Sequence, residues 1–174
     1  MNYKVNSMFL SLFMLFIIFS SNGFAQDNRI YQLSDTDGVS ANSNLTARNA
    51  SNILIEYPKD LLYGLAPSIY IQNNAIQNVE GATAPTVLKF KDVQSFGFIS
   101  TRNELYNKVE MITIDIESVN DLQTPFDVDL IRGFNNLKYI YLKCEFPITE
   151  SQIRAFIQNA DPEISIFYKK INRS

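Results

Sequence analysis

Three carboxylates near the middle of the chain are the residues best suited, by type and spacing, to acid–base chemistry. Asp115 and Glu117 are two residues apart, and Asp121 follows four residues later. Paired carboxylates can hydrolyse a glycosidic bond, and carboxylate clusters can bind calcium. The chain has no D-x-D-x-D-G calcium loop, and lysines are expected on the strands beside Asp115 and Glu117. We interpret these acids as structural charges and keep a carboxylate-based hydrolase as the alternative.

Composition restricts the other catalytic and metal-binding chemistry. The 174 residues include no His and one Cys, Cys144. Without His the chain cannot build a His-based triad, a His metal site or a His proton shuttle. A single Cys makes neither an intramolecular disulfide nor a multi-Cys zinc site. The sequence therefore predicts a protein that is not an enzyme and that uses no cofactor or metal.

A second set of side chains suits binding. These side chains are large aromatic or charged groups that alternate with apolar residues along strand-like segments, so they share one face of the expected sheet. The set comprises Tyr139, Tyr141, Phe167, Asp115, Glu117, Lys143 and Lys169. We predict a recognition face in which the three rings form an exposed aromatic cluster framed by the charges, because such clusters mark contact surfaces. The alternative is a solvated face of complementary charges.

The overall charge limits the partners of such a face. The chain carries 15 basic and 18 acidic residues, which gives a net charge of −3. A mildly acidic protein offers no basic footprint for phosphates, so we expect no nucleic acid. The expected partner is another protein or a glycan, and the expected function is a non-catalytic binding or protein-interaction module. A structural or inhibitory component of a surface assembly is a further alternative.

Four strand-like segments must position these side chains. They cover residues 87–91, 112–117, 139–143 and 164–168, and helix-compatible stretches at 101–108, 126–135 and 149–160 lie between them. The last stretch is the clearest helix, since Thr149 and Gln152 form a capping-box pattern. Right-handed crossovers bring successive strands into a parallel sheet. We expect Ile114, Ile140, Leu142, Phe156, Ile157 and Ile166 to be buried between sheet and helices.

The repeated spacing resembles a leucine-rich repeat. Residues 109–114 read Val-x-x-Ile-x-Ile and residues 137–142 read Leu-x-x-Ile-x-Leu, which look like the L-x-x-L-x-L strand core of that family. The Asn or Cys that normally follows this core is absent, so the likeness is to a degenerate repeat. The predicted fold class is α/β with repeated strand–helix units and a mainly parallel sheet. It is either a leucine-rich-repeat-like solenoid or a small open α/β sandwich.

The chain divides into three parts. Residues 1–25 have one Lys, a 12-residue apolar run from Met8 to Phe19 and a small-residue cut site before Gln26, so they resemble a secretory signal peptide of exported bacterial proteins. The run is too short to span a bilayer, so no stable membrane anchor is expected. We predict a periplasmic or secreted protein. Residues 26–52 read as a flexible polar leader with a short strand at 29–33, and 53–174 as a single α/β domain.

Further elements are predicted early in that domain. Strands are expected at 53–57 and 68–72, a helical turn at 59–64 and a loop at 73–85. The loop prediction depends on the polar and glycine content of residues 73–85.

Overall fold

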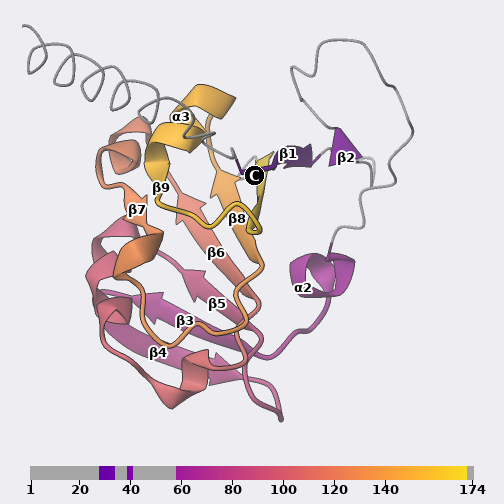
Figure 1. The fold of residues 1–174 in the computed structure, drawn as a ribbon, viewed down its shortest axis with the longest axis vertical. Coiled ribbons are helices and arrows are strands. Elements are labelled where there is room, and N and C mark those ends of the chain that lie inside the picture. Colours follow the sequence, from indigo (N-terminus) through magenta and orange to yellow (C-terminus); the bar gives the residue numbers. More distant parts are fainter. Residues whose placement is uncertain (1–27, 34–38, 41–57, 172–174) are drawn as a thin grey trace, which may run out of the picture.

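The computed structural model describes residues 28–33, 39–40 and 58–171, which form a mixed α/β structure on one large, mostly parallel sheet (Figure 1). The eight strands follow the order β2-β1-β10-β8-β6-β5-β3-β4, and only the outermost pairs, β1 with β2 and β3 with β4, are antiparallel. The predicted signal peptide and the strand predicted at 53–57 lie outside the described residues.

The strands of the main sheet occupy the following ranges: β1 Ile30–Leu33, β2 Val39–Ser40, β3 Ser68–Gln72, β4 Ala75–Glu80, β5 Val87–Phe90, β6 Met111–Ile116, β8 Tyr139–Cys144 and β10 Ser165–Lys170. A second, two-stranded sheet pairs β7 (Phe126–Asp127) with β9 (Ile157–Gln158). The α-helices are α2 (Lys59–Tyr63) and α3 (Glu150–Phe156). Four 3-10 helices complete the described part: η1 Val93–Ser100, η2 Glu104–Tyr106, η3 Val119–Gln123 and η4 Val128–Leu130.

The central strands lie side by side in the order in which they occur in the sequence. The strands β3, β5, β6, β8 and β10 are all parallel, and β1 is added beside β10. One apolar position of each strand falls on a common line across the sheet: Ile69, Leu88, Ile112, Ile140, Ile166 and Ile30. The short strand predicted at 29–33 is β1. It pairs with β10, so part of the range predicted as a flexible leader belongs to this sheet.

One face of the sheet carries the main hydrophobic core. The 3-10 helices and α3 pack on this face, and all six residues that the sequence placed in the core are buried there. The ring of Phe96 on η1 packs at 4.9 Å from that of Phe126 and at 5.1 Å from that of Phe90, so these aromatic side chains join the connections to the sheet. Alternation along the strands therefore predicted the correct faces.

The predicted connections differ from the observed ones. Only η2 forms within 101–108, and the stretch 126–135 contains β7 and the short 3-10 helix η4 rather than an α-helix. Asp127 explains part of this, since its carboxylate accepts a hydrogen bond from the backbone N–H of Asp129 and caps a single short turn. The helix expected to reach residue 160 ends at Phe156, because the chain turns into β9 and Asn159 has a positive φ of 54°.

The predicted capping box at the start of α3 is confirmed. The Thr149 hydroxyl accepts from the Gln152 backbone N–H, and the Gln152 side chain accepts from the Thr149 backbone N–H at 2.9 Å. These bonds satisfy N–H groups that a helix start leaves without intrahelical partners. Ile153 and Phe156 then point into the core.

The loop predicted at 73–85 is instead a β-hairpin followed by a loop. Asn73 and Asn74 have φ values of 53° and 55°, the left-handed conformation that a two-residue hairpin turn needs and that Asn tolerates. The turn leads directly into β4, which pairs with β3 at the edge of the sheet. The Asn-Asn pair between two strand-like runs was the signal for this hairpin.

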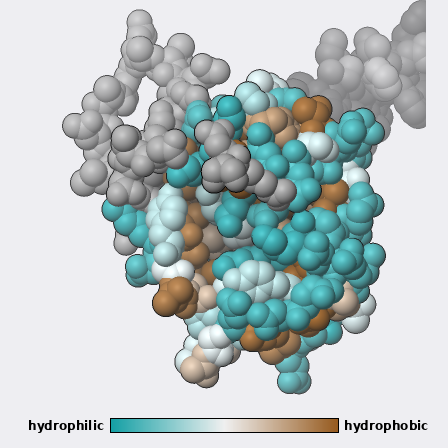
Figure 2. All heavy atoms as spheres, turned by 180° about the vertical axis from the view of Figure 1, so that it is seen from behind, coloured by the Kyte–Doolittle hydropathy of each residue, from teal (hydrophilic) through white to brown (hydrophobic). Residues whose placement is uncertain are grey.

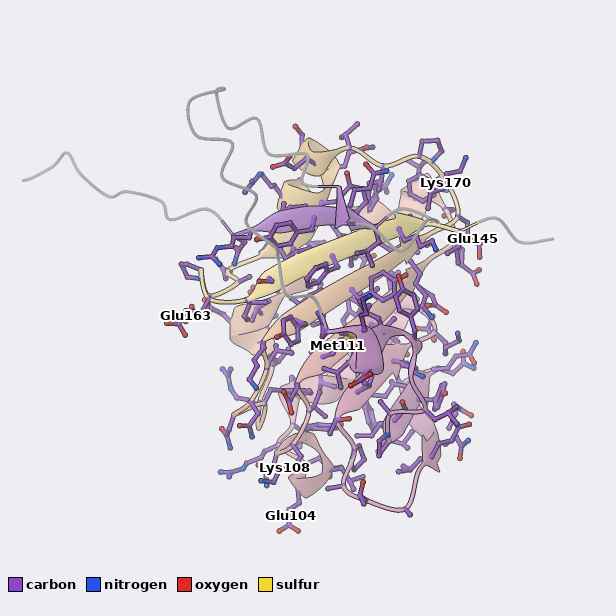
Figure 3. All side chains as sticks on the ribbon, turned by 90° about the vertical axis from the view of Figure 1, so that its right-hand side faces the viewer. Glu104, Lys108, Met111, Glu145, Glu163 and Lys170 are labelled. Carbon is purple, nitrogen blue, oxygen red and sulfur yellow. The ribbon has the colours of Figure 1, made fainter. Side chains whose placement is uncertain are left out.

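The other face of the sheet is covered by α2 over part of its width. Figure 3 looks onto this face, which we call the α2 face, with α2 in front of the strands. Leu61, Leu62 and Ala66 pack against a second, smaller apolar cluster there, which contains Leu33, Val87, Met111, Tyr141 and Phe167. The sheet therefore buries apolar residues on both faces.

Candidate binding surface on the α2 face

The strand registers arrange the side chains of the α2 face in three rows that cross the sheet. The first row joins Ser68, Val87, Met111, Tyr139 and Ser165. The second joins Tyr70, Lys89, Thr113, Tyr141, Phe167 and Tyr31. In the third, Asp115 is the register partner of Lys143, which is in turn the partner of Lys169, and Lys91 pairs with Asp115 from the β5 side. We call Lys91, Asp115, Lys143 and Lys169 the charged row.

The three predicted aromatic residues gather on this face, but the prediction that they form an exposed cluster is wrong. The rings of Tyr139 and Phe167 lie 6.1 Å apart. Tyr141 and Phe167 are only 4% and 1% exposed, while Tyr139 is half-buried. They belong to the apolar cluster under α2, and Tyr31 of β1 stacks on Phe167 at 5.3 Å. Because α2 and β1 pack against this cluster, the rings that were expected to contact a partner belong to the core instead.

The charged row is the more accessible part of the α2 face. Lys91 donates to Asp115 Oδ2 in an ion pair between β5 and β6, and the side chains of these residues are 41% and 13% exposed. Lys143 lies on the opposite side of Asp115, half-buried, with its amine 6.0 Å from the centroid of the Tyr141 ring. Among the described residues, no carboxylate lies within ion-pair distance of the Lys143 amine.

A further lysine lies next to the charged row in the second row. The Lys89 amine donates to the Tyr70 hydroxyl at 3.1 Å and lies 4.8 Å from the centroid of that ring, which is a cation–π distance. The Tyr70 hydroxyl in turn donates to Glu80 at 2.9 Å. Lys89 is thus held in a chain of polar contacts that ends on the edge strand β4.

Burial and neighbouring charges shift the pKa values of two lysines on this face. Burial lowers the pKa of Lys143, the attraction of Asp115 raises it, and repulsion by Lys91 and Lys89 lowers it. Burial likewise lowers the pKa of Lys89, which Glu80 opposes and Lys91 reinforces. Lys89, Lys91 and Lys143 therefore all lie near Asp115, and Glu80 is a second carboxylate that attracts Lys89.

Asp121, the third acid of the predicted group, has a local structural role. The Asp121 carboxylate accepts from the backbone N–H groups of Glu117 and Ser118, at 2.9 and 2.8 Å, and caps η3. Asp92 similarly accepts from the Asn73 backbone and from the Ser95 hydroxyl. A shallow hollow of about 80 Å³ at the carboxyl ends of β5 and β6 is lined by Lys91, Asp92, Val93, Gln94, Asp115, Glu117 and Asp121.

The described residues contain no group of three His, Cys, Asp or Glu side chains arranged to hold a metal ion. No helix in the same ranges combines the length and the apolar character needed to cross a bilayer. The side of the molecule seen in Figure 2 is mostly hydrophilic, with its hydrophobic residues in small separate patches. That side therefore does not present one continuous apolar contact area.

A comparison of the chain with protein-family models, curated proteins and solved structures found no match. The surface must therefore be interpreted from its own geometry. Tyr70, Lys89 and Lys91 were not among the predicted site residues, although Lys89 and Lys91 share the parity of the α2 face and the sequence placed them beside Asp115. Strand alternation and charge could have found both lysines.

Proposed function

We propose that this chain is an exported, non-catalytic binding module whose contact surface is the charged row with Lys89. The observation that carries the proposal is the placement of these amines on adjoining parallel strands around Asp115, beside the part of the face that α2 covers. Strands that are buried on their other face hold charged groups in fixed positions, which favours recognition over a purely solvated surface.

The alternative of a carboxylate-based hydrolase has less support. Such an enzyme needs two carboxylates that converge on one bond, one of them free to act as an acid. Asp115 is paired with Lys91, and Asp121 accepts two backbone hydrogen bonds. Both carboxylates therefore already have structural partners within the fold.

Export is proposed on the basis of residues 1–25. A charged start, a 12-residue apolar run and the Gly-Phe-Ala sequence before Gln26 are the three parts of a signal peptide. Mass spectrometry of the product made from the full-length gene in a bacterial host should show a chain that begins at Gln26. A membrane-retained product of full precursor mass would contradict this.

A solenoid-like arrangement is the finer fold proposal. It is supported by the five parallel strands from β3 to β10, which are adjacent in the sheet in sequence order, as stacking of successive units requires. The connections from β5 to β6, from β6 to β8 and from β8 to β10 pack on the side of the main core, whereas the connection from β3 to β5 contains the edge strand β4. The likeness to leucine-rich repeats stays a proposal within this arrangement. An experimental structure with a closed or two-layered sheet would contradict it.

The function is tested by capture with variants of the surface. The purified product of the full-length gene is immobilised and exposed to the periplasmic fraction and culture medium of its source cells. A Lys89→Glu, Lys143→Glu double variant should lose the captured partner, because it reverses the local charge. The control is the double variant Lys108→Glu, Lys138→Glu, which has the same change in net charge. These two residues precede β6 and β8, at the amino-terminal ends of the strands. Equal capture by all three proteins would contradict the proposal.

A further inference from the structure

The strand β4 forms one edge of the main sheet, and no described segment pairs with its outer side (Figure 1). Residues 77–80 of this strand are exposed, and Val79 is 44% exposed although it is apolar. Natural sheets normally protect an edge with lysines, Pro or a very short strand, because unpaired N–H and C=O groups can pair with another chain. The strand β4 has six residues and contains neither Lys nor Pro. It is therefore an edge that is open to pairing.

The hairpin of β3 and β4 is also almost free of charge. Residues 61–79 contain no Asp, Glu, Lys or Arg, and Glu80 is the only charged residue from 61 to 88, although 19% of the chain is charged. Like charges on facing strands oppose pairing, whereas a neutral extended segment favours it. The edge therefore suits another neutral strand, and β4 of a second copy is such a strand.

The parallel ladder between β3 and β5 determines which backbone groups of β3 face β4. The C=O of Ile71 accepts from the N–H of Lys91 at 2.9 Å, and the C=O of Pro67 accepts from the N–H of Val87 at 3.1 Å. The odd-numbered residues of β3 therefore direct their N–H and C=O groups to β5. Because these groups alternate in direction along a strand, the even-numbered residues direct theirs to β4.

The same alternation turns the backbone of Val79 outwards. Ser68 and Tyr70 have Glu80 and Asn78 as their register partners on β4, so these two residues of β4 direct their N–H and C=O groups inwards. Val79 lies between them. Its N–H and C=O consequently point away from β3, to the open side of the edge.

Two copies of this edge are complementary when they pair antiparallel around Val79. Val79 then lies opposite Val79 of the second copy, with two N–H···O=C bonds between them, and Asn78 lies opposite Glu80 of the second copy. Val79 shares the core face with its register partner Ile69, so the two valine side chains meet on that face.

The pair formed by Asn78 and Glu80 is matched in its hydrogen-bonding groups. An amide N–H₂ has two donors and a carboxylate can accept about four hydrogen bonds. Within the chain Glu80 accepts from Asn78 at 3.1 Å and from the Tyr70 hydroxyl at 2.9 Å, which leaves capacity for the amide of a second copy. The attraction between Glu80 and Lys89 reduces the repulsion between the two carboxylates.

We infer that β4 pairs antiparallel with β4 of a second copy, centred on Val79, and that the two main sheets become one sheet across a two-fold axis. The inference goes beyond the proposed function, because the charged row takes no part in this contact. The axis is perpendicular to the sheet, so the α2 faces of both copies lie on the same side. The regular part of the edge is short, since Gln77 has no register partner on β3, so we expect a weak dimer.

The first test is the mass of the purified product of the full-length gene in solution. Sedimentation equilibrium from about 10 µM to about 1 mM should show a monomer that converts to a dimer, because a small contact gives a weak affinity. A monomer at every concentration would overturn the inference.

Variants of Val79 make this test specific. Val79→Lys and Val79→Pro should both remain monomeric, because Lys protects an edge and Pro removes an N–H that points outwards. The matched control is Val119→Lys, since Val119 is 58% exposed on η3, outside the sheet. This control should dimerise like the wild type. Dimerisation of Val79→Lys, or its loss in Val119→Lys, would overturn the inference. Circular dichroism and thermal melts identify the variants that are folded at the assay temperature.

A cysteine at the proposed axis tests the register. In Val79→Cys the two Cα atoms should be about 5.5 Å apart, within the range of a disulfide. Oxidised glutathione, which accepts the two electrons, should therefore link this variant into a dimer. Asn78→Cys and the control Val119→Cys should link at least about fivefold more slowly, because neither position lies opposite itself. The native Cys144 is buried and should not compete. Equal linking rates at the three positions would overturn the inference.

Discussion

Asp115 forms its ion pair with Lys91 rather than with Lys143, its register partner on β8. Lys91 approaches from the β5 side and Lys143 from the β8 side, so the carboxylate lies between two amines and bonds to one of them. The Asp115 side chain is 13% exposed, whereas the Lys91 side chain is 41% exposed. The Asp115 carboxylate is the more buried partner of the ion pair, and its negative charge stabilises the ammonium groups of Lys91 and Lys143.

Asp115→Asn should therefore destabilise the protein. The substitution removes the Lys91 ion pair and leaves three ammonium groups without their shared carboxylate, so we expect a loss of about 1–3 kcal/mol in the free energy of unfolding at pH 7. Glu110→Gln, which breaks the more exposed pair with Lys138, should cost about 0–1 kcal/mol. Urea unfolding of both variants makes the comparison, and equal losses would mean that Asp115 is not the compensating charge.

Lys143→Met should stabilise the protein. It removes an amine whose charged form is disfavoured by burial and by Lys91 and Lys89, and it keeps a long apolar side chain against Tyr141. The expected gain is roughly 0.5–2 kcal/mol at pH 7, the range of common stabilising substitutions. A gain accompanied by loss of the partner captured by the wild-type protein would indicate that the lysine is kept for recognition rather than for folding, and a loss of stability would contradict the prediction.

The pH dependence of that gain follows from the lowered pKa of Lys143. Below its folded pKa the amine is charged in both the folded and the unfolded chain, so the cost of burying the charge is fully present. Between the folded pKa and the unfolded value of about 10.4, the unfolded chain binds more protons, and stability rises with pH. The difference between wild type and Lys143→Met should consequently narrow as pH rises towards 10. Parallel urea titrations at pH 7 and pH 9.5 measure it, and a widening difference would contradict the assignment.

Tyr141→Ala should behave as a core substitution. Its ring is 4% exposed and packs under α2 with Phe167 and Met111, so the truncation should cost about 3–5 kcal/mol. Burial also raises the pKa of Tyr141 above its usual value, so this group adds stability that is lost as pH rises above about 10. Leu130→Ala is the control, since Leu130 is 60% exposed and should change stability by less than about 0.5 kcal/mol. A small effect of Tyr141→Ala on a thermal melt would restore the exposed-ring interpretation.

The aromatic prediction shows which part of the site the sequence could not provide. Period-two alternation placed Tyr141, Phe167, Lys143 and Asp115 correctly on one face. Alternation says which side chains share a face, but not what covers that face. The cover comes from α2, a five-residue helix far away in the sequence, and from Tyr31 on β1.

The fold was predictable where periodicity was strong and where a local bond set the boundary. The central strands and the Thr149 cap are examples of each. The connections were not, because 3-10 segments such as η1 have no amphipathic period of their own and are fixed by tertiary packing of Phe96 and Ile99. The hairpin at Asn73 was missed because a polar stretch was interpreted as a loop, although two consecutive Asn residues suit a tight turn.

Cys144 provides a probe for the packing of the central strand β8. It is the last residue of β8, its side chain is fully buried, and burial raises the pKa of its thiol to about 12. Since the thiolate is the reactive form, the native protein should not react with a thiol reagent at pH 8, and one thiol per chain should react in guanidinium chloride. The raised pKa also makes the folded chain retain a proton that the unfolded chain loses above about 8.5, so stability should fall as pH rises beyond that value. Cys144→Ala should reduce this part of the pH dependence and abolish the reaction in guanidinium chloride. Rapid, complete labelling of the native protein at pH 8 would show that the end of β8 is open, and that the core beneath the charged row is less closed than its side-chain packing indicates.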